Sequence, residues 1–194
     1  GTGTGILGIL LCGKTDLSKI YGIEVQQEVA EMAQRSIKLN NLENRFEIIN
    51  KNIKDLESVF DKNSFDFIIT NPPYKKMDTG KTNENSKKLI SRHEITATLK
   101  DFIKISYIML KDKGTLYMVH KPERLVDIIY QLRKNKIEPK EIRFVHPYEK
   151  KEPNLILIKA VKNGGQFLKI DKPLYVYNER GEYTEEILKI YNKM

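Results

Sequence analysis

Two consecutive prolines directly after an apolar run constrain the fold of this chain more than any other feature. Residues 65–70 (Phe-Asp-Phe-Ile-Ile-Thr) have the character of a buried strand, and Asn71-Pro72-Pro73-Tyr74 follows at once. Neither proline has an N–H to donate to a sheet, and each fixes φ at about −65°, so the strand has to end there in a rigid, extended turn. The turn therefore presents the Asn71 amide and the Tyr74 ring at the carboxyl end of a strand.

Strand-like and helix-like segments alternate along the rest of the chain. Strands are expected at residues 20–25, 46–49, 65–70, 114–120, 142–146 and 155–161, and helices at 26–39, 53–60, 96–110 and 123–135. This alternation predicts an α/β fold with a doubly wound, mostly parallel sheet. We assign residues 1–163 to one domain. Residues 164–194 form a tail on the same domain, with a short hairpin and a terminal helix.

In open α/β sheets, ligands bind at the carboxyl ends of the strands. The turn at residues 71–74 is therefore a candidate site. An amide oxygen beside an aromatic ring suits a flat, amine-bearing substrate such as a nucleobase.

A glycine-rich turn, Gly1-Thr2-Gly3-Thr4-Gly5, opens the chain and leads into an apolar, helix-compatible segment. Glycines let a ligand approach the backbone closely, and the helix that follows offers free N–H groups. Glu24 lies about twenty residues on, the spacing at which an acid accepts hydrogen bonds from ribose hydroxyls. Residues 3–8 also fit the dinucleotide pattern, so a nicotinamide cofactor remains open at this point.

No strand precedes the glycine turn, although such a turn follows a strand in folds of this kind. The first strand normally lies in the middle of the sheet, and its neighbours would lose a partner without it. We therefore expect the natural protein to continue upstream of Gly1.

Composition narrows the classes of partner. The 194 residues carry a net charge of +8, which favours a polyanion, and nucleic acid above all. A single cysteine, Cys12, excludes an intramolecular disulfide and fits a reducing cytoplasm. No apolar run is long enough to span a membrane, and three histidines with one cysteine show no metal-ligand spacing. We expect a cytoplasmic protein without metal or membrane.

Taken together, the glycine turn, Glu24 and the Asn71–Tyr74 tetrapeptide resemble a known family. They are similar to the fingerprint of class I S-adenosylmethionine-dependent methyltransferases that modify exocyclic or amide nitrogens. Within that class the chain resembles bacterial valine-tRNA (adenine-37-N6) methyltransferases. The segments that extend this resemblance are 92–94 (Arg-His-Glu), 120–124 (His-Lys-Pro-Glu-Arg), 143–147 (Arg-Phe-Val-His-Pro) and 173–177 (Pro-Leu-Tyr-Val-Tyr).

The resemblance implies a Rossmann-like, seven-stranded sheet whose last strand is antiparallel, and S-adenosylmethionine as cofactor. It assigns the cofactor contacts to Gly1, Gly3, Gly5, Glu24, Asn52, Ile53 and Asn71. It assigns catalysis to Asn71, Pro72 and Tyr74. Members usually carry Asp where this chain has Asn52, which keeps a carbonyl acceptor but loses the charge.

The substrate implied by the resemblance is RNA, most specifically tRNA, with the methyl group placed on N6 of adenine. Substrate contacts are expected from Pro73, Tyr74, Lys75, Lys76, Arg92 and His93. Tyr74 and His93 flank a polar, lysine-rich loop at residues 75–92, which we expect to bind RNA phosphates.

Other functions fit parts of the pattern. A protein-glutamine N5-methyltransferase or a ribosomal-RNA guanine-N2 methyltransferase would use the same tetrapeptide, and the basic charge favours RNA. DNA adenine methylation is less favoured because no separate target-recognition domain is visible. From other classes, a nicotinamide-binding oxidoreductase leaves the tetrapeptide unexplained, and a non-catalytic RNA-binding relative stays open.

Overall fold

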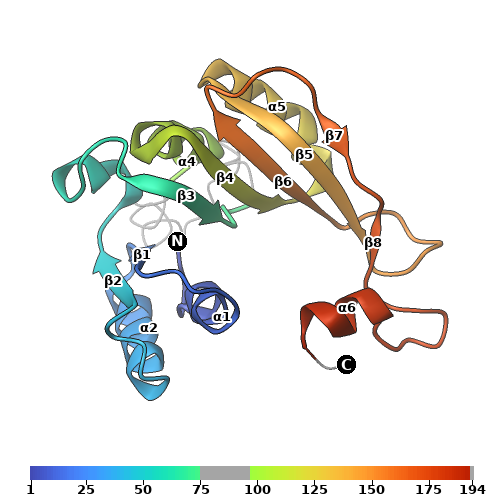
Figure 1. The fold of residues 1–194 in the computed structure, drawn as a ribbon, viewed down its shortest axis with the longest axis horizontal. Helices are drawn as coiled ribbons and strands as arrows, with labels where there is room; N and C mark the ends of the chain where they lie inside the picture. Colours follow the sequence, from blue (N-terminus) through green and yellow to red (C-terminus); the bar gives the residue numbers. More distant parts are fainter. Residues whose placement is uncertain (75–96, 193–194) are drawn as a thin grey trace, which may run out of the picture. The chain divides into compact units, whose positions relative to one another are not determined.

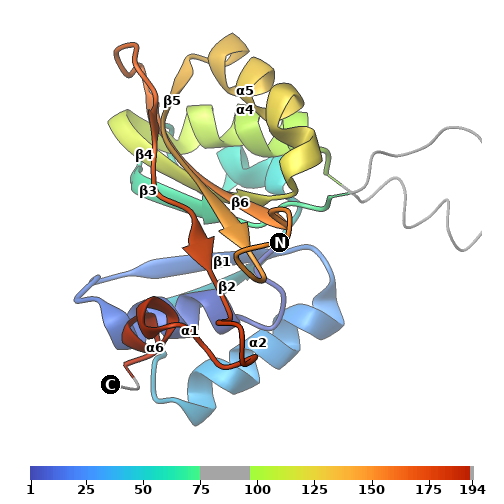
Figure 2. The same ribbon diagram turned by 90° about the vertical axis from the view of Figure 1, so that its right-hand side faces the viewer.

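The computed structural model describes residues 1–74 and 97–192, which fall into two compact units (Figures 1 and 2). The first unit comprises Gly1–Asp61 and, among the described residues, 97–105. The second comprises Lys62–Tyr74 and the chain from Ser106 onward. Each unit is described by itself.

The first unit is built on a parallel pair of strands, β1 (Ile20–Glu24) and β2 (Phe46–Asn50). Helices α1 (Ile6–Lys14) and α2 (Gln27–Leu39) pack on one face of this pair. Small residues of α2 allow the helix to lie close to the strands. The buried core consists of Cys12, Ala30, Ala33, Ile37, Phe46 and Ile48.

The Phe46 ring sets how closely α1 approaches β2. A Cβ on Gly8 would lie 2.3 Å from the ring, so only glycine fits at this position of α1. Arg45, next to Phe46, donates hydrogen bonds to the carbonyls of Cys12, Thr15 and Leu17, and so holds the carboxyl end of α1. The end of α1 and the start of β2 are therefore fixed to each other.

The second unit contains a mixed sheet in the order β3-β4-β6-β5-β7. Its long strands are β3 (Phe65–Thr70), β4 (Leu110–His120), β5 (Ile137–His146) and β6 (Leu155–Lys162). β3 and β4 run parallel, and β6 is antiparallel to both β4 and β5. Helix α5 (Leu125–Lys134) lies against one face of the sheet.

Helix α4 (Leu99–Met109) leads directly into β4. At this junction Lys162 of β6 is buried, with its ammonium donating to Asn63 Oδ1 (2.6 Å) and to the carbonyls of Tyr107 (2.6 Å) and Leu110 (2.8 Å). A buried ammonium needs such acceptors, because an unpaired charge in the interior is strongly unfavourable. Lys162 thus ties β6 to the end of α4.

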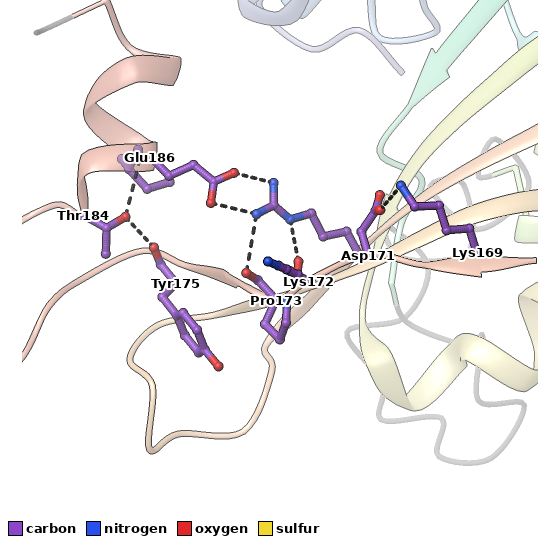
Figure 3. Close-up of polar contacts among 9 residues, drawn as sticks. Lys169, Asp171, Lys172, Pro173, Tyr175, Thr184 and Glu186 are labelled. Carbon is purple, nitrogen blue, oxygen red and sulfur yellow. Dashed lines mark hydrogen bonds and ion pairs between the residues drawn. The ribbon is translucent and has the colours of Figure 1, made fainter.

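The tail returns to the outer side of the sheet. Strands β7 (Lys169–Ile170) and β8 (Leu174–Tyr175) both pair in parallel with β5 and not with each other. The hairpin-like turn of the tail lies further on, where Tyr177 and Tyr183 form an antiparallel bridge. Helix α6 (Glu185–Ile190) follows, and Thr184 caps it (Figure 3). The tail covers an edge of β5 that would otherwise be unpaired.

The predicted α/β fold with a mainly parallel sheet is confirmed, and β6, the last strand before the tail, is antiparallel as predicted. The expected division at residue 163 and the expected upstream segment stay predictions.

Candidate active site

The glycine turn of the first unit has the backbone conformation that only glycine adopts easily. Gly3 has φ 58° and Gly5 has φ 85°, both in the left-handed region. A Cβ on Gly3 would meet nothing within 4 Å, which leaves open space beside the turn. Gly5 stands at the N-cap of α1, where no side chain caps the helix. The first N–H groups of α1 are therefore available to a ligand.

Glu24 lies at the end of β1 and is buried, with 5% of its surface exposed. Its Oε2 accepts from the Gly3 N–H (2.9 Å) and its Oε1 from the Gln26 N–H (3.1 Å). The carboxylate thus fixes the glycine turn. Each carboxylate oxygen has a second lone pair, so this geometry also leaves Glu24 able to accept from a ligand hydroxyl.

Asn52 and Ile53 begin the short 3-10 helix η1 (Ile53–Ser58) after β2. The Asn52 side-chain oxygen accepts from the Lys54 N–H at 3.0 Å, and the Ile53 side chain is buried. Asn52 is therefore the N-cap of η1, a role that Asp would fill as well. This explains locally how Asn is accepted at a position where the resemblance implies Asp.

The Gly8 packing against Phe46 accounts for the third glycine of the dinucleotide-like pattern. It is explained by helix–strand contact alone. The third glycine of dinucleotide-binding folds serves the same close packing, so this contact does not distinguish a nicotinamide cofactor from S-adenosylmethionine.

In the second unit the tetrapeptide leaves β3 as predicted. Asn71 and Pro73 are exposed, Pro72 is fully buried, and Tyr74 is half-buried. Among the described residues none hydrogen-bonds to the Asn71 side chain. The buried Pro72 anchors the turn and leaves the amide of Asn71 turned to the surface, available to a substrate.

Tyr74 is held by residues at the end of β4, a contact that the sequence analysis missed. Its ring meets His120 edge-on, with centroids 5.1 Å apart and planes at 61°. The Arg124 Nη1 donates to the Tyr74 carbonyl (3.3 Å), and the Arg124 Nε donates to Asp127 (2.8 Å). β3 and β4 are parallel neighbours, so their carboxyl ends meet. Strand order would have been the signal needed to find this contact.

His120 is completely buried, and its Nδ1 accepts from the Lys121 N–H at 2.8 Å. Burial lowers the pKa of His120, and the nearby Arg124 guanidinium lowers it further. A neutral ring that accepts at Nδ1 carries its proton on Nε2. That Nε2 has no hydrogen-bond partner among the described residues. The ring therefore meets Tyr74 as a neutral group.

Four predicted substrate contacts, Lys75, Lys76, Arg92 and His93, lie outside the described residues, as does the lysine-rich loop. The remaining predicted residues fall into two sets. Gly1, Gly3, Gly5, Glu24, Asn52 and Ile53 belong to the first unit, and the tetrapeptide belongs to the second.

A hollow of about 310 Å³ lies on one face of the second unit's sheet, and none of the predicted site residues lines it. Its walls combine apolar side chains such as Tyr117 and Leu157 with ion-paired ones such as Lys159 and Glu141. Across residues 1–74 and 97–192 there is no cluster of metal-ligating side chains, and no helix is long and apolar enough to cross a membrane.

A family model described as the methyltransferase small domain matches residues 1–129, about two thirds of the chain. The chain belongs to this methyltransferase family. The matched residues include both the glycine turn and the tetrapeptide, so the predicted family is confirmed.

Curated relatives that match this chain share one name. A tRNA1(Val) (adenine(37)-N6)-methyltransferase of Porphyromonas gingivalis is 28% identical over 159 residues, which cover 81% of this chain and 62% of the relative. The protein of the same name from Parabacteroides distasonis is 26% identical and covers 98% of this chain and 78% of its own length. The chain thus spans less than two thirds of the Porphyromonas relative.

Solved structures of other methyltransferases share the fold. A predicted O-methyltransferase from Agrobacterium tumefaciens superposes with a TM-score of 0.80 at 20% identity, covering 99% of this chain and 86% of that one. A SAM-dependent methyltransferase from Aquifex aeolicus gives 0.59 at 18% identity, with 84% and 79% covered. At such identities the likeness concerns the fold alone.

Proposed function

We propose that this protein transfers a methyl group from S-adenosylmethionine to an exocyclic amine of a nucleobase in RNA, specifically to N6 of adenine in tRNA. The observation that carries the proposal is the exposed Asn71 amide, which has no hydrogen-bond partner among the described residues, in the same turn as the half-buried Tyr74 at the carboxyl end of β3. The names of the curated relatives support tRNA as the substrate.

The residues of the first unit fit the cofactor. The glycines of the turn have no side chains to obstruct a ligand, α1 offers uncapped N–H groups, and the buried Glu24 retains acceptor capacity at the turn. Gly1, Gly3, Gly5 and Glu24 would hold S-adenosylmethionine, with Asn52 and Ile53 at its adenine. When bound, this cofactor supplies an activated methyl group.

The tetrapeptide would act on the acceptor. The lone pair of an exocyclic amine is delocalised into the base, which makes the nitrogen a poor nucleophile. The Asn71 side-chain oxygen and the Pro72 carbonyl are two acceptors that would take hydrogen bonds from the amine, favour a pyramidal nitrogen and localise its lone pair. Tyr74 would stack on the base and hold it in place, an interaction worth about 1–3 kcal/mol. Orientation of this kind supplies much of a rate enhancement.

Labelled S-adenosylmethionine, incubated with the protein and with tRNA, ribosomal RNA or release-factor protein in parallel, tests the proposal. Label in N6-methyladenosine from digested tRNA is the expected result. Label only in N2-methylguanosine or in glutamine would assign the rival methyltransferase activities. No transfer to any acceptor by the natural full-length protein would refute a methyltransferase function.

Substitutions then test the roles within the tetrapeptide. Asn71→Ala is expected to lower kcat by about 10²–10³, the usual cost of losing a preorganised transition-state contact. Tyr74→Phe should be mild and Tyr74→Ala severe, because stacking needs the ring and not the hydroxyl. Cofactor affinity, measured separately by calorimetry, distinguishes loss of chemistry from loss of binding. Unchanged turnover in Asn71→Ala would remove this residue from the mechanism.

A further inference from the structure

The ring of Tyr74 is in contact with a positively charged side chain. The ammonium of Lys121 lies over the ring, 5.7 Å from its centroid, and also donates to the Asn154 carbonyl at 3.2 Å. Lys121 immediately follows β4, whose last residue, His120, meets the same ring edge-on. The aromatic surface proposed to receive the base is thus in contact with a lysine before any substrate arrives.

The backbone and the side chains around Tyr74 are held with different strength. The guanidinium of Arg124 binds the Tyr74 carbonyl and is itself oriented by Asp127, while Pro72 is fully buried. Among the described residues, the Lys121 ammonium contacts only a ring face and one exposed carbonyl. A cation–π contact at an exposed site is weak and readily exchanged. The backbone that carries the ring is therefore fixed, and the lysine over the ring is replaceable.

An arriving nucleotide offers a better partner to both groups. Base–aromatic stacking is stronger than an exposed cation–π contact, and a phosphate is a stronger acceptor for an ammonium than a carbonyl is. A lysine has four rotatable methylenes, so its head can move while its backbone stays in place. The Lys121 N–H remains bound to His120 Nδ1, which anchors that backbone.

We propose that Lys121 is a substrate-binding residue that changes partner: it covers Tyr74 in the free protein, and its ammonium binds the phosphate of the nucleotide whose base stacks on Tyr74. This inference rests on the proposed function. It places one phosphate contact of the RNA at the end of β4, within the described residues.

Kinetics with RNA give the first test. Lys121→Ala is expected to raise KM for tRNA about tenfold, as for loss of a hydrogen bond to a charged group, with little change in kcat. The slope of log affinity against log salt should fall by about 0.7–0.9, the contribution of a single phosphate. Lys121→Arg should restore most of the affinity. An unchanged KM and salt slope in Lys121→Ala would refute the proposal.

The chain offers a matched control. Lys134, the last residue of α5, lies over the Tyr130 ring at 5.6 Å, which is the same kind of contact on an exposed tyrosine. It is separated along α5 from the η3 turn (Pro122–Arg124) by about 14 Å of helix. Lys134→Ala removes the same charge, so an equal effect on KM would mean that only net charge matters, and would also refute the proposal.

A second test uses fluorescence to detect directly the replacement of Lys121 by a base over the ring at position 74. The chain contains no tryptophan, so Tyr74→Trp introduces a single indole at the ring position, whose emission is distinct from that of the tyrosines. Its emission should be quenched when an RNA stem-loop stacks on it, and adding Lys121→Ala should weaken that binding about tenfold. Removing Lys121 should also change the emission of the free protein, because the ammonium no longer lies over the indole. Identical free spectra and identical RNA affinities would contradict the exchange.

The two proposals fail in different ways. If the wild type transfers no methyl group to RNA, the proposed function fails before any variant is compared. If the wild type methylates tRNA while Lys121→Ala matches it in KM, salt slope and fluorescence, only the role of Lys121 fails.

Discussion

At the scale of single residues, Glu24 combines a structural and a proposed ligand-binding role. Its position about twenty residues after the glycine turn predicted contact with a ribose. Its contacts add that the same carboxylate receives N–H groups from Gly3 and Gln26 while nearly fully buried. Glu24, which would bind the ribose of the cofactor, therefore also fixes the glycine turn that would hold the cofactor.

Glu24→Gln tests this double role. Its amide nitrogen would face an N–H donor where a carboxylate oxygen now accepts, so we expect a loss of about 1–3 kcal/mol in the free energy of unfolding. Affinity for S-adenosylmethionine should fall at least tenfold. Thermal unfolding and calorimetric titration measure the two effects. Wild-type affinity in a folded Glu24→Gln variant would exclude Glu24 from the cofactor site.

His120 predicts a pH dependence of stability. Burial lowers the pKa of His120 in the folded state below the ordinary value of 6.5, so the ring binds a proton more readily in the unfolded chain than in the folded one. Above about pH 6.5 the His120 ring is neutral in both states and does not lower the free energy of unfolding. Below that pH the free energy of unfolding falls, by at most about 1.4 kcal/mol per pH unit.

Denaturant unfolding of the wild type and of His120→Gln between pH 7.5 and 5.5 measures this effect. We expect the wild type to lose more stability than the variant over that range. His146→Gln replaces another histidine, at the end of β5, and is the control for the loss of an imidazole ring as such. Parallel curves for wild type and His120→Gln would contradict the assignment.

At the scale of elements, helix α1 contains two glycines with opposite surroundings. A Cβ on Gly8 would lie 2.3 Å from the Phe46 ring, whereas a Cβ on Gly13 would meet nothing within 4 Å. Close packing of α1 on β2 thus needs glycine at one position and gains nothing from it at the other.

Gly8→Ala and Gly13→Ala form a matched pair. Gly8→Ala should destabilise the protein by about 1–3 kcal/mol, because the ring or the helix has to move. Gly13→Ala should stabilise it by up to about 1 kcal/mol through helix propensity. Chemical denaturation of both variants gives the comparison. Equal effects of the two substitutions would show that the Gly8–Phe46 contact does not limit the packing.

At the scale of the whole molecule, the tail is joined to the sheet by more than strand pairing. Arg143 of β5 binds both oxygens of Glu186 (2.7 and 2.8 Å) and donates to the carbonyls of Lys172 (2.9 Å) and Pro173 (3.4 Å). Figure 3 shows the carboxylate of Glu186 and the carbonyls on this clamp. The side chains of Leu174 and Ile187 pack with Val145 in a small core beside it.

Arg143→Met should loosen the tail without unfolding the sheet. We expect faster proteolytic cleavage between residues 164 and 184, since opening of the tail becomes easier. The Arg143 hydrogen bond lowers the pKa of Glu186, so the clamp's contribution is present above the ordinary pKa of that carboxyl and is lost as the pH falls. Lys150→Met, which removes an exposed ion pair with Glu179, is the control. Equal cleavage rates in both variants would contradict the clamp.

Much of the architecture followed from local patterns. Alternating strand and helix segments predicted the α/β fold, and the strands and helices of residues 20–70 lie where the periodicity placed them. β4 and β5 begin earlier than predicted, at Leu110 and Ile137, because Lys113 and Pro139 lie in stretches without strand-like character. The tail was predicted least well, since β7 and β8 have two residues each and are defined only by pairing with β5.

The sequence by itself determined the turn at Pro72-Pro73 and the glycine turn, because imino acids and missing Cβ atoms restrict the backbone over a few residues whatever surrounds them. Only the tertiary structure decided what meets these turns. Arg124 reaches the Tyr74 carbonyl from fifty residues away, and it does so because β3 and β4 are parallel neighbours. Strand order depends on non-local packing, which periodicity along the chain does not encode.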